Sequence, residues 1–193
     1  MKSILALIKK ENDQFVAAHD ESYFAPHQKA QHPQVTLVSC CDSRVQPHVL
    51  LSDPIDKIFA VENIGNQLKT AQGSVDYGIL HLHTPVLLIL GHTDCGAIKA
   101  FMKGYEKENE AIKKEIDTLK GALPEFDKKA DFDAELKKNI QKNIDYQVEV
   151  ATNRYKTLID AGSLTVVGAV YDFLNIFNQG TGRVIVTSIN GKK

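Results

Sequence analysis

Short runs of β-branched and aliphatic residues alternate with helix-type segments along this chain. Five of these runs are predicted to be strands: Val35–Ser39, Lys57–Val61, Val86–Leu90, Leu164–Tyr171 and Arg183–Ser188. Strands that alternate with helices indicate an α/β fold built on a central, mostly parallel β-sheet. A loop containing Gly180 and Gly182 separates the last two runs, so we expect an antiparallel edge strand there.

The segments that separate the strands have helical spacing of apolar residues. Four stretches are predicted to be helical: residues 3–18, 74–83, 103–145 and 146–161. The first is interpreted as one or two amphipathic segments, and the third as exposed helices with solvated faces. Ser74 is a plausible N-cap, and the last helix is expected to end near Gly162. The predicted helices therefore flank the sheet.

The composition is that of one ordinary folded domain. The chain has 193 residues, of which 43% are hydrophobic and 24% charged, so a disordered chain is excluded. We expect a single domain over 1–193, with 1–34 as an N-terminal helical arm and loop. The formal net charge of -1 provides no large positive field, so we expect neither nucleic acid nor an anionic membrane as a partner.

Cysteine usage and hydropathy point to the cytoplasm. Three cysteines are too few and odd in number for a disulfide framework, and Cys40 and Cys41 are neighbours. The apolar stretch at the N-terminus is short and ends in charge, which is unlike a signal peptide. The longest uncharged apolar stretch, Pro85–Gly91, is far below the roughly 20 residues that a membrane helix needs.

Two polar segments follow two of the predicted strands directly. Cys40-Cys41-Asp42-Ser43-Arg44 comes after the first strand, and His92-Thr93-Asp94-Cys95-Gly96 comes after the third. In an open parallel sheet, binding sites form in the crevice beyond the carboxyl ends of the strands. Both segments occupy that position, so we expect their side chains to converge.

Cys40, His92 and Cys95 together form a set of ligands suited to zinc. Two thiolates and one imidazole match this borderline-soft ion, which prefers tetrahedral coordination. Only three protein ligands are evident, and the open fourth position is typical of a catalytic rather than a structural zinc. The alternative is that both thiols fill the core and that the histidine bonds to the backbone.

Asp42 and Arg44 lie two and four residues after Cys40, on the same side if the extended conformation continues. An Asp paired with an Arg is held ionised and fixed in orientation, so this carboxylate could accept a hydrogen bond from a hydroxide on the metal. The alternative is a purely structural ion pair. Cys41 would face away from the site, and we expect it to pack in the core.

These residues carry a resemblance to the β-class carbonic anhydrases. The two segments match the Cys-x-Asp-Ser-Arg and His-x-x-Cys-Gly motifs of that family, which together are highly specific. The residues 59–66 are similar to the segment between the motifs, and 77–82 resemble the plant-type, open-site members. The similarity is close over about residues 30–101 and looser elsewhere, including Tyr171-Asp172 and Thr181-Gly182.

The resemblance implies reversible hydration of CO2 to bicarbonate and a proton, through attack by a zinc hydroxide. One Zn2+ per chain would be held by Cys40, His92 and Cys95, and Asp42, oriented by Arg44, would be catalytic. The family also implies a homodimer or tetramer with pockets at the interface. Four residues match the substrate pocket of plant-type members: Gln31, Phe59, Ile64 and Tyr77.

Two alternative functions are compatible with the same predicted site. Relatives with this zinc motif can hydrolyse carbonyl sulfide or carbon disulfide. A catalytically silent zinc-binding sensor is the second alternative, because Glu62 stands where the family usually has Arg. Some members close their site with bicarbonate held near a Trp and that Arg. Leu37 and Glu62 occupy the corresponding positions here, so we expect the site to stay open.

Overall fold

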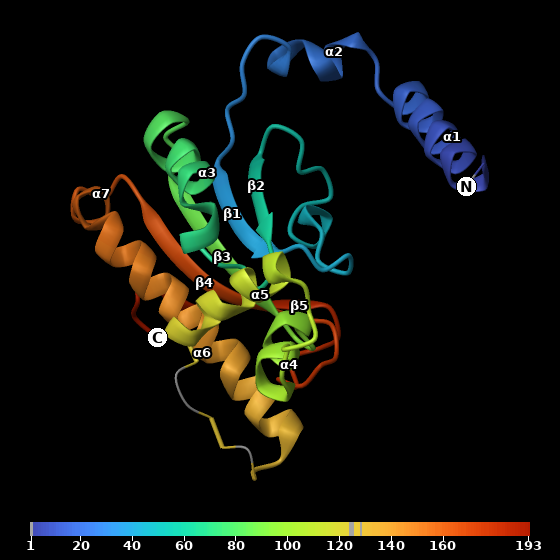
Figure 1. The fold of residues 1–193 in the computed structure, drawn as a ribbon. Coiled ribbons are helices and arrows are strands. Elements are labelled where there is room, and N and C mark those ends of the chain that lie inside the picture. The colour runs from blue at the N-terminus through green and yellow to red at the C-terminus, as the bar shows by residue number, and fades with distance from the viewer. Residues whose placement is uncertain (1, 124–125, 128) are drawn as a thin grey trace. The chain divides into compact units, whose positions relative to one another are not determined.

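The computed structural model describes residues 2–123, 126–127 and 129–193 (Figure 1). The chain divides into two compact units, Met1–His32 and Pro33–Lys193. In the first unit, α1 (Lys2–Ala18) is one helix, and it is followed by α2 (Glu21–Phe24), which Asp20 caps with its side chain. Apolar side chains of α1 are largely exposed in the chain: Ile4, Leu5, Leu7, Ile8 and Val16.

The second unit is built on a five-stranded sheet with the order β2-β1-β3-β4-β5. The strands are β1 (Val35–Cys40), β2 (Ile58–Asn63), β3 (Val86–His92), β4 (Thr165–Asp172) and β5 (Arg183–Ile189). The first four run parallel, and β5 pairs antiparallel with β4 at the edge. The predicted α/β fold with an antiparallel edge strand is therefore confirmed.

The order of the strands reverses between β1 and β3. From β1 the chain goes to β2 on one side, then returns to β3 on the other side and continues outward to β4. In open α/β sheets, the crevice at such a reversal, beyond the carboxyl ends of the strands, is the usual place for a binding site. Cys40 and His92 are the last residues of the two strands that border it.

Helices flank this sheet, and several of their bounds differ from the predicted ones. The structure has α3 (Gln72–Asp76), a π-helical turn (Tyr77–His81), α4 (Gly96–Lys103), α5 (Glu110–Asp117), α6 (Phe132–Arg154) and α7 (Lys156–Asp160). Short 3-10 helices cover Ala25–His27, Pro47–Val49, Lys69–Ala71 and Thr118–Gly121. Within the described residues, no helix combines the length and hydropathy needed to cross a membrane.

The first correction concerns Ser74, which is not an N-cap. The 3-10 turn Lys69–Ala71 leads directly into α3 at Gln72, so Ser74 lies inside the helix. The second concerns the predicted boundary at residue 145. Instead, α6 runs without interruption through this position, because its apolar residues stay on one face on both sides of it. That face is buried, so residues 132–145 are not merely an exposed helix.

The core lies mainly between α6 and the sheet. Ile140, Ile144 and Val148 of α6 belong to one buried cluster with Leu87 and Ile89 of β3. Figure 1 shows α6 running alongside the strands that it covers. Alternate strand residues point to the opposite face, where a smaller cluster forms from Leu37, Val45, Leu90 and Ala169. Both faces of the central strands are thus buried, as their continuous apolar runs require.

Gly78 permits a close approach between the π-helical turn and β1. A Cβ at this position would overlap Oγ1 of Thr36 and lie 3.1 Å from the Phe59 ring. We expect Gly78→Ala to lower the free energy of unfolding by about 1–3 kcal/mol, because the packed backbone must shift. Chemical denaturation measures this change, and a Gly78→Ala variant as stable as the wild type would contradict the close packing.

Gly73 in α3 provides the matched control for this substitution. Among the described residues, no atom apart from its chain neighbours and the backbone of its own helix would lie within 4 Å of a Cβ at this position. Alanine is the better helix former by roughly 0.5–1 kcal/mol, so we expect Gly73→Ala to be neutral or stabilising. If the free energy of unfolding falls in Gly78→Ala but not in Gly73→Ala, the loss is due to overpacking and not to a general effect of alanine.

Candidate metal centre

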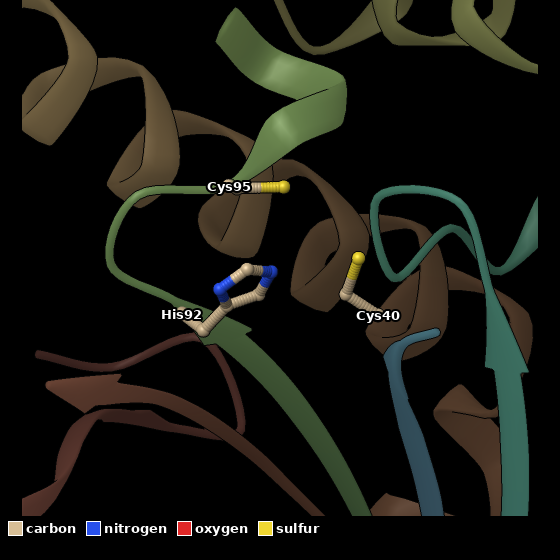
Figure 2. Close-up of side chains that lie close together, drawn as sticks. All are labelled: Cys40, His92 and Cys95. Atoms are coloured by element: carbon tan, nitrogen blue, oxygen red, sulfur yellow. The ribbon is translucent and has the colours of Figure 1, made fainter. Parts of the chain in front are cut away.

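Three side chains with metal-binding atoms converge at the reversal of the sheet. Cys40 ends β1, His92 ends β3, and Cys95 is the N-cap residue of α4. Figure 2 shows the imidazole of His92 with the two sulfur atoms beside it. The ligand atoms all lie within 4.8 Å of one another, and all three residues are buried. This group could hold a metal ion.

The imidazole of His92 is fixed in an orientation that suits coordination. Its Nδ1 lies 2.8 Å from the carbonyl oxygen of Thr93, and its Nε2 is buried without a hydrogen-bond partner in the described chain. With Nδ1 as the donor, Nε2 carries the free lone pair. A buried, unpartnered nitrogen is costly, so this observation fits a metal ligand and argues against a histidine satisfied by backbone.

The two thiols interact strongly with each other. A hydrogen bond from Cys95 and the nearby His92 lower the pKa of Cys40 to about 4, against the opposing effect of burial. The same contact with Cys40, together with complete burial, raises the pKa of Cys95. A divalent cation bound by both sulfurs would stabilise both thiolates.

Asp42 and Arg44 form a bidentate pair next to this cluster. Arg44 Nε and Nη2 donate to Asp42 Oδ1 and Oδ2 at 2.9 and 2.8 Å, and the Arg44 backbone N–H donates to Oδ1 at 3.0 Å. These bonds hold the pKa of Asp42 well below its usual range and raise that of Arg44. The carboxylate is therefore ionised near neutral pH and is fixed in orientation.

Sequence reasoning missed the second carboxylate on Arg44. Asp94 Oδ2 accepts from Arg44 Nη1 at 3.0 Å, and its Oδ1 accepts from Lys99 Nζ at 2.6 Å. Both cations lower the pKa of Asp94, Lys99 most strongly. Asp94 thus binds the Nη1 end of the guanidinium, while Asp42 binds the edge formed by Nε and Nη2. Its position inside the second motif was a signal, but the motif does not reveal which cation it meets.

Phe173 is a second residue that the sequence did not single out. It follows β4 directly, and the Arg44 guanidinium lies 4.6 Å from the centre of its ring. The same ring stacks near the imidazole of His92, with centroids 6.0 Å apart. One aromatic side chain therefore contacts both a potential metal ligand and the cation of the Asp42–Arg44 pair. Such a contact favours a fixed guanidinium plane.

Cys41 is exposed, so the expectation that it packs in the core is wrong. The reason is that β1 ends at Cys40, and the alternation of strand side chains does not continue beyond it. The Cys41 N–H still donates to the Asn63 carbonyl at 3.0 Å. All three cysteines are free thiols.

Two predicted pocket residues, Phe59 and Tyr77, lie away from Cys40. Phe59 pairs with Thr36, whereas Cys40 pairs with Asn63, so Phe59 is four residues, or roughly 13 Å, back along β2. Tyr77 is close to Phe59, with ring centroids 5.9 Å apart, and is 44% exposed. Ile64 directly follows Asn63, the register partner of Cys40, and packs against the buried cluster that contains Cys40. Gln31 belongs to the first unit and is exposed.

The fold and the site together define an α/β protein with a Cys2His metal-binding group at the reversal of its sheet. Residues 35–180, most of the chain, match the family model described as carbonic anhydrase. The chain belongs to this family, and its solved structural neighbours place it in the β class.

Individual relatives agree with this assignment. The carbonic anhydrase of Synechococcus elongatus is 31% identical over an alignment of 96 residues, and the match covers 42% of this chain and 35% of that protein. A Coccomyxa β-carbonic anhydrase, solved with acetazolamide, has a TM-score of 0.79 at 25% identity and covers 97% of this chain and 86% of its own. A Sordaria macrospora structure, described as tetrameric, has a TM-score of 0.78 at 21% identity and covers 97% of each chain. The chain spans less than half the length of the curated relatives that it matches.

Proposed function

We propose that this protein catalyses the reversible hydration of CO2 to bicarbonate and a proton, with one Zn2+ per chain held by Cys40, His92 and Cys95. The observation that carries the proposal is that Nε2 of His92 is buried beside the thiols of Cys40 and Cys95 and has no hydrogen-bond partner among the described residues. The membership of the chain in the carbonic anhydrase family supplies the reaction. Three protein ligands leave one tetrahedral position for water, as in catalytic zinc sites.

Asp42 and Arg44 are the residues that we assign to the reaction. Zinc, when bound, would lower the pKa of a coordinated water toward about 7 and so supply a nucleophile near neutral pH. Asp42 is ionised, so it accepts hydrogen bonds and cannot donate them. Its Oδ1 receives two hydrogen bonds from Arg44 and its Oδ2 only one. Oδ2 is therefore the atom that would accept a hydrogen bond from the nucleophile and so direct its lone pair at CO2.

The open-site, plant-type arrangement is part of the proposal. Both oxygens of Asp42 are engaged by Arg44, which Asp94 holds in turn, and this supports a resting state in which Asp42 does not coordinate the metal. Leu37 is buried in an apolar cluster and offers no donor to bicarbonate. Glu62 is exposed and would repel the anion. Bicarbonate therefore has no preferential affinity for a closed site in which Asp42 coordinates the metal, and it shifts the equilibrium between the open and closed sites little.

We place the substrate pocket at an interface between two copies of the chain. Phe59 and Tyr77 lie along β2 from Cys40 in the same chain, which supports a role in the site of a partner. Gln31 and Ile64 complete the proposed pocket. The exposed apolar residues of α1 need a surface to cover them. We therefore propose a homodimer or tetramer of single-domain subunits, with residues 1–34 as the arm.

The remaining assignments concern the environment of the protein. We propose a cytoplasmic enzyme whose partners are CO2 and bicarbonate, without nucleic acid or membrane. Three free thiols support a reducing compartment. The net charge of -1 supports the absence of polyanionic partners.

Stopped-flow hydration of CO2 with a pH indicator tests the proposed reaction. The zinc-loaded protein should accelerate proton release far above the buffer blank, and chelation should remove the acceleration. Carbonyl sulfide and carbon disulfide, tested on the same preparation, should be turned over much more slowly. Preferential turnover of either sulfur compound would assign a different hydrolase function. A protein that binds zinc without any catalysis would be a silent sensor.

The same assay tests the open site. Activity measured against pH at several bicarbonate concentrations should decline gradually on mild acidification, with no cooperative step that bicarbonate deepens. The reason is that Leu37 and Glu62 give bicarbonate no preferential hold on a closed state. A steep loss that grows with bicarbonate would contradict the plant-type assignment and leave the CO2 activity itself intact.

A further inference from the structure

A row of polar side chains is buried on the face of α6 that meets the sheet. Glu135, Asn139, Asn143 and Gln147 follow one another at intervals of four residues, so they share one stripe of the helix. Asn139 and Asn143 are fully buried, and Gln147 is 2% exposed. A buried amide is costly unless its hydrogen bonds are made, so the partners of this row reveal its role.

Two residues of this row form hydrogen bonds with a single turn of the chain. Asn143 Nδ2 donates to the carbonyl of Gly65 at 2.9 Å and to Asn66 Oδ1 at 3.3 Å. Gln147 Oε1 accepts from the backbone N–H of Leu68 at 3.0 Å. Gln147 Nε2 also donates to Asn143 Oδ1 at 3.1 Å, which fixes the Asn143 amide. The two side chains therefore act as one unit on residues 65–68.

This turn contains two consecutive residues in the left-handed conformation. Gly65 and Asn66 have positive φ angles of 79° and 49°, which glycine adopts freely and asparagine tolerates. Asn63 closes the turn, because its Oδ1 accepts from the Gln67 backbone N–H at 2.7 Å and its Nδ2 donates to the Gln67 carbonyl at 2.6 Å. These local features define the shape of the turn, whereas the hydrogen bonds from α6 fix its position relative to the rest of the chain.

The turn reaches the candidate metal centre through its backbone. Asn63, at the end of β2, is the register partner of Cys40 at the end of β1. Two residues further on, the Gly65 backbone N–H faces the Cys40 sulfur as a hydrogen-bond donor. Gly65 also packs close to α4, because a Cβ at Gly65 would lie 3.4 Å from the Cβ of Ala97, two residues after Cys95. Hydrogen bonds from outside the ligand set orient such sulfurs and tune their binding of the metal.

We infer that Asn143 and Gln147 are positioning residues of the metal centre, which hold the turn at residues 65–68 so that the Gly65 amide faces the sulfur of Cys40. The inference rests on the proposed zinc site. It assigns to α6 a role besides core packing, although none of its side chains is among the three ligands.

Substitution of the two amides tests the inference. In Asn143→Leu and Gln147→Met, the side-chain size is nearly kept but the hydrogen bonds to the turn are lost. We expect zinc affinity, measured by competition with a chromogenic chelator, to fall about 10- to 100-fold, the range for outer partners of a metal ligand. With Co2+ in place of zinc, the thiolate-to-cobalt charge-transfer band should shift, because the hydrogen bond to the Cys40 sulfur changes.

Asn139→Leu is the matched control. Asn139 is equally buried one turn earlier on the same stripe, but neither of its amide atoms has a hydrogen-bond partner among the residues that the structure describes. Its replacement should leave zinc affinity and the cobalt band unchanged, and the free energy of unfolding unchanged or higher. A fall in zinc affinity equal to that of Asn143→Leu would attribute the effect to general repacking and overturn the inference.

Zinc binding by the wild-type protein distinguishes a failure of the positioning role from a failure of the proposed function. Suppose that the wild type binds zinc, and that a folded Asn143→Leu or Gln147→Met variant has the same zinc affinity and an unshifted cobalt band. This result would overturn the positioning role alone. Failure of the wild type to bind zinc would overturn the proposed function as well. Circular dichroism identifies the variants that are folded. If Asn143→Leu does not fold, the zinc affinity and the cobalt band of Gln147→Met decide the test.

Discussion

Cys95→Ala is expected to abolish stoichiometric zinc binding. The substitution leaves Cys40 and His92 as the remaining protein ligands, and two ligands cannot hold the ion tightly. The loss of affinity should exceed the roughly 10- to 100-fold effect of removing an outer partner of a ligand. Zinc per chain, measured by atomic spectroscopy after dialysis against a chelator, should fall from about one in the wild type to near zero.

Cys41→Ala provides the matched control for this loss. Cys41 is also a free thiol and is the direct neighbour of Cys40, but it is exposed and outside the ligand group. This variant should keep its zinc and its CO2 hydration activity. One tightly bound zinc per chain in Cys95→Ala would show that Cys95 is not a ligand.

Asp42→Asn is expected to keep zinc and to slow CO2 hydration by about 10- to 100-fold. The amide retains one oxygen but replaces the other by a donor, so the acceptor for the nucleophile and the negative charge are lost. Arg44 remains anchored by Asp94 and by the ring of Phe173, so the surrounding structure should change little. Steady-state stopped-flow kinetics, with zinc content measured on the same samples, checks the expectation.

The kinetic constant that changes in Asp42→Asn shows which step the carboxylate affects. Because Asp42 would act on the nucleophile and not on substrate entry, kcat should fall and KM should change little. Asp160→Asn is a suitable control, since Asp160 forms an exposed ion pair with Lys156 at 2.6 Å within α7. Unchanged hydration kinetics in Asp42→Asn would reduce Asp42 to a structural partner of Arg44.

The positions of the strands were predictable because each is a local run of apolar residues. The five predicted strands match β1 to β5 to within one or two residues at each end. Helix boundaries were less predictable. The interior of α6 at residue 145 carries no stop signal, but its charged outer face hides the continuous buried stripe. Ser74 illustrates the same limit, because a capping residue type does not specify that a helix begins there.

The candidate ligands were predictable from their place after two strands, and this place has a physical reason. Residues that end parallel strands lie at the same edge of a sheet, so Cys40 and His92 approach each other although 51 residues separate their positions. The distinctive residue types then limit the chemistry to a soft or borderline metal. Strand prediction and ligand chemistry are both local properties, and the sequence by itself determined them.

Only the tertiary structure decided which partners complete the site. The strand order puts the reversal between β1 and β3, and this order depends on the packing of the whole sheet. Asp94 and Phe173 meet Arg44, and Asn143 meets Gly65 across 78 residues, through the docking of loops and of α6. Such contacts depend on side-chain geometry between distant segments, which leaves no periodic signal in the sequence. The sequence therefore determined the candidate ligands and the strands, whereas tertiary packing determined how those side chains are held.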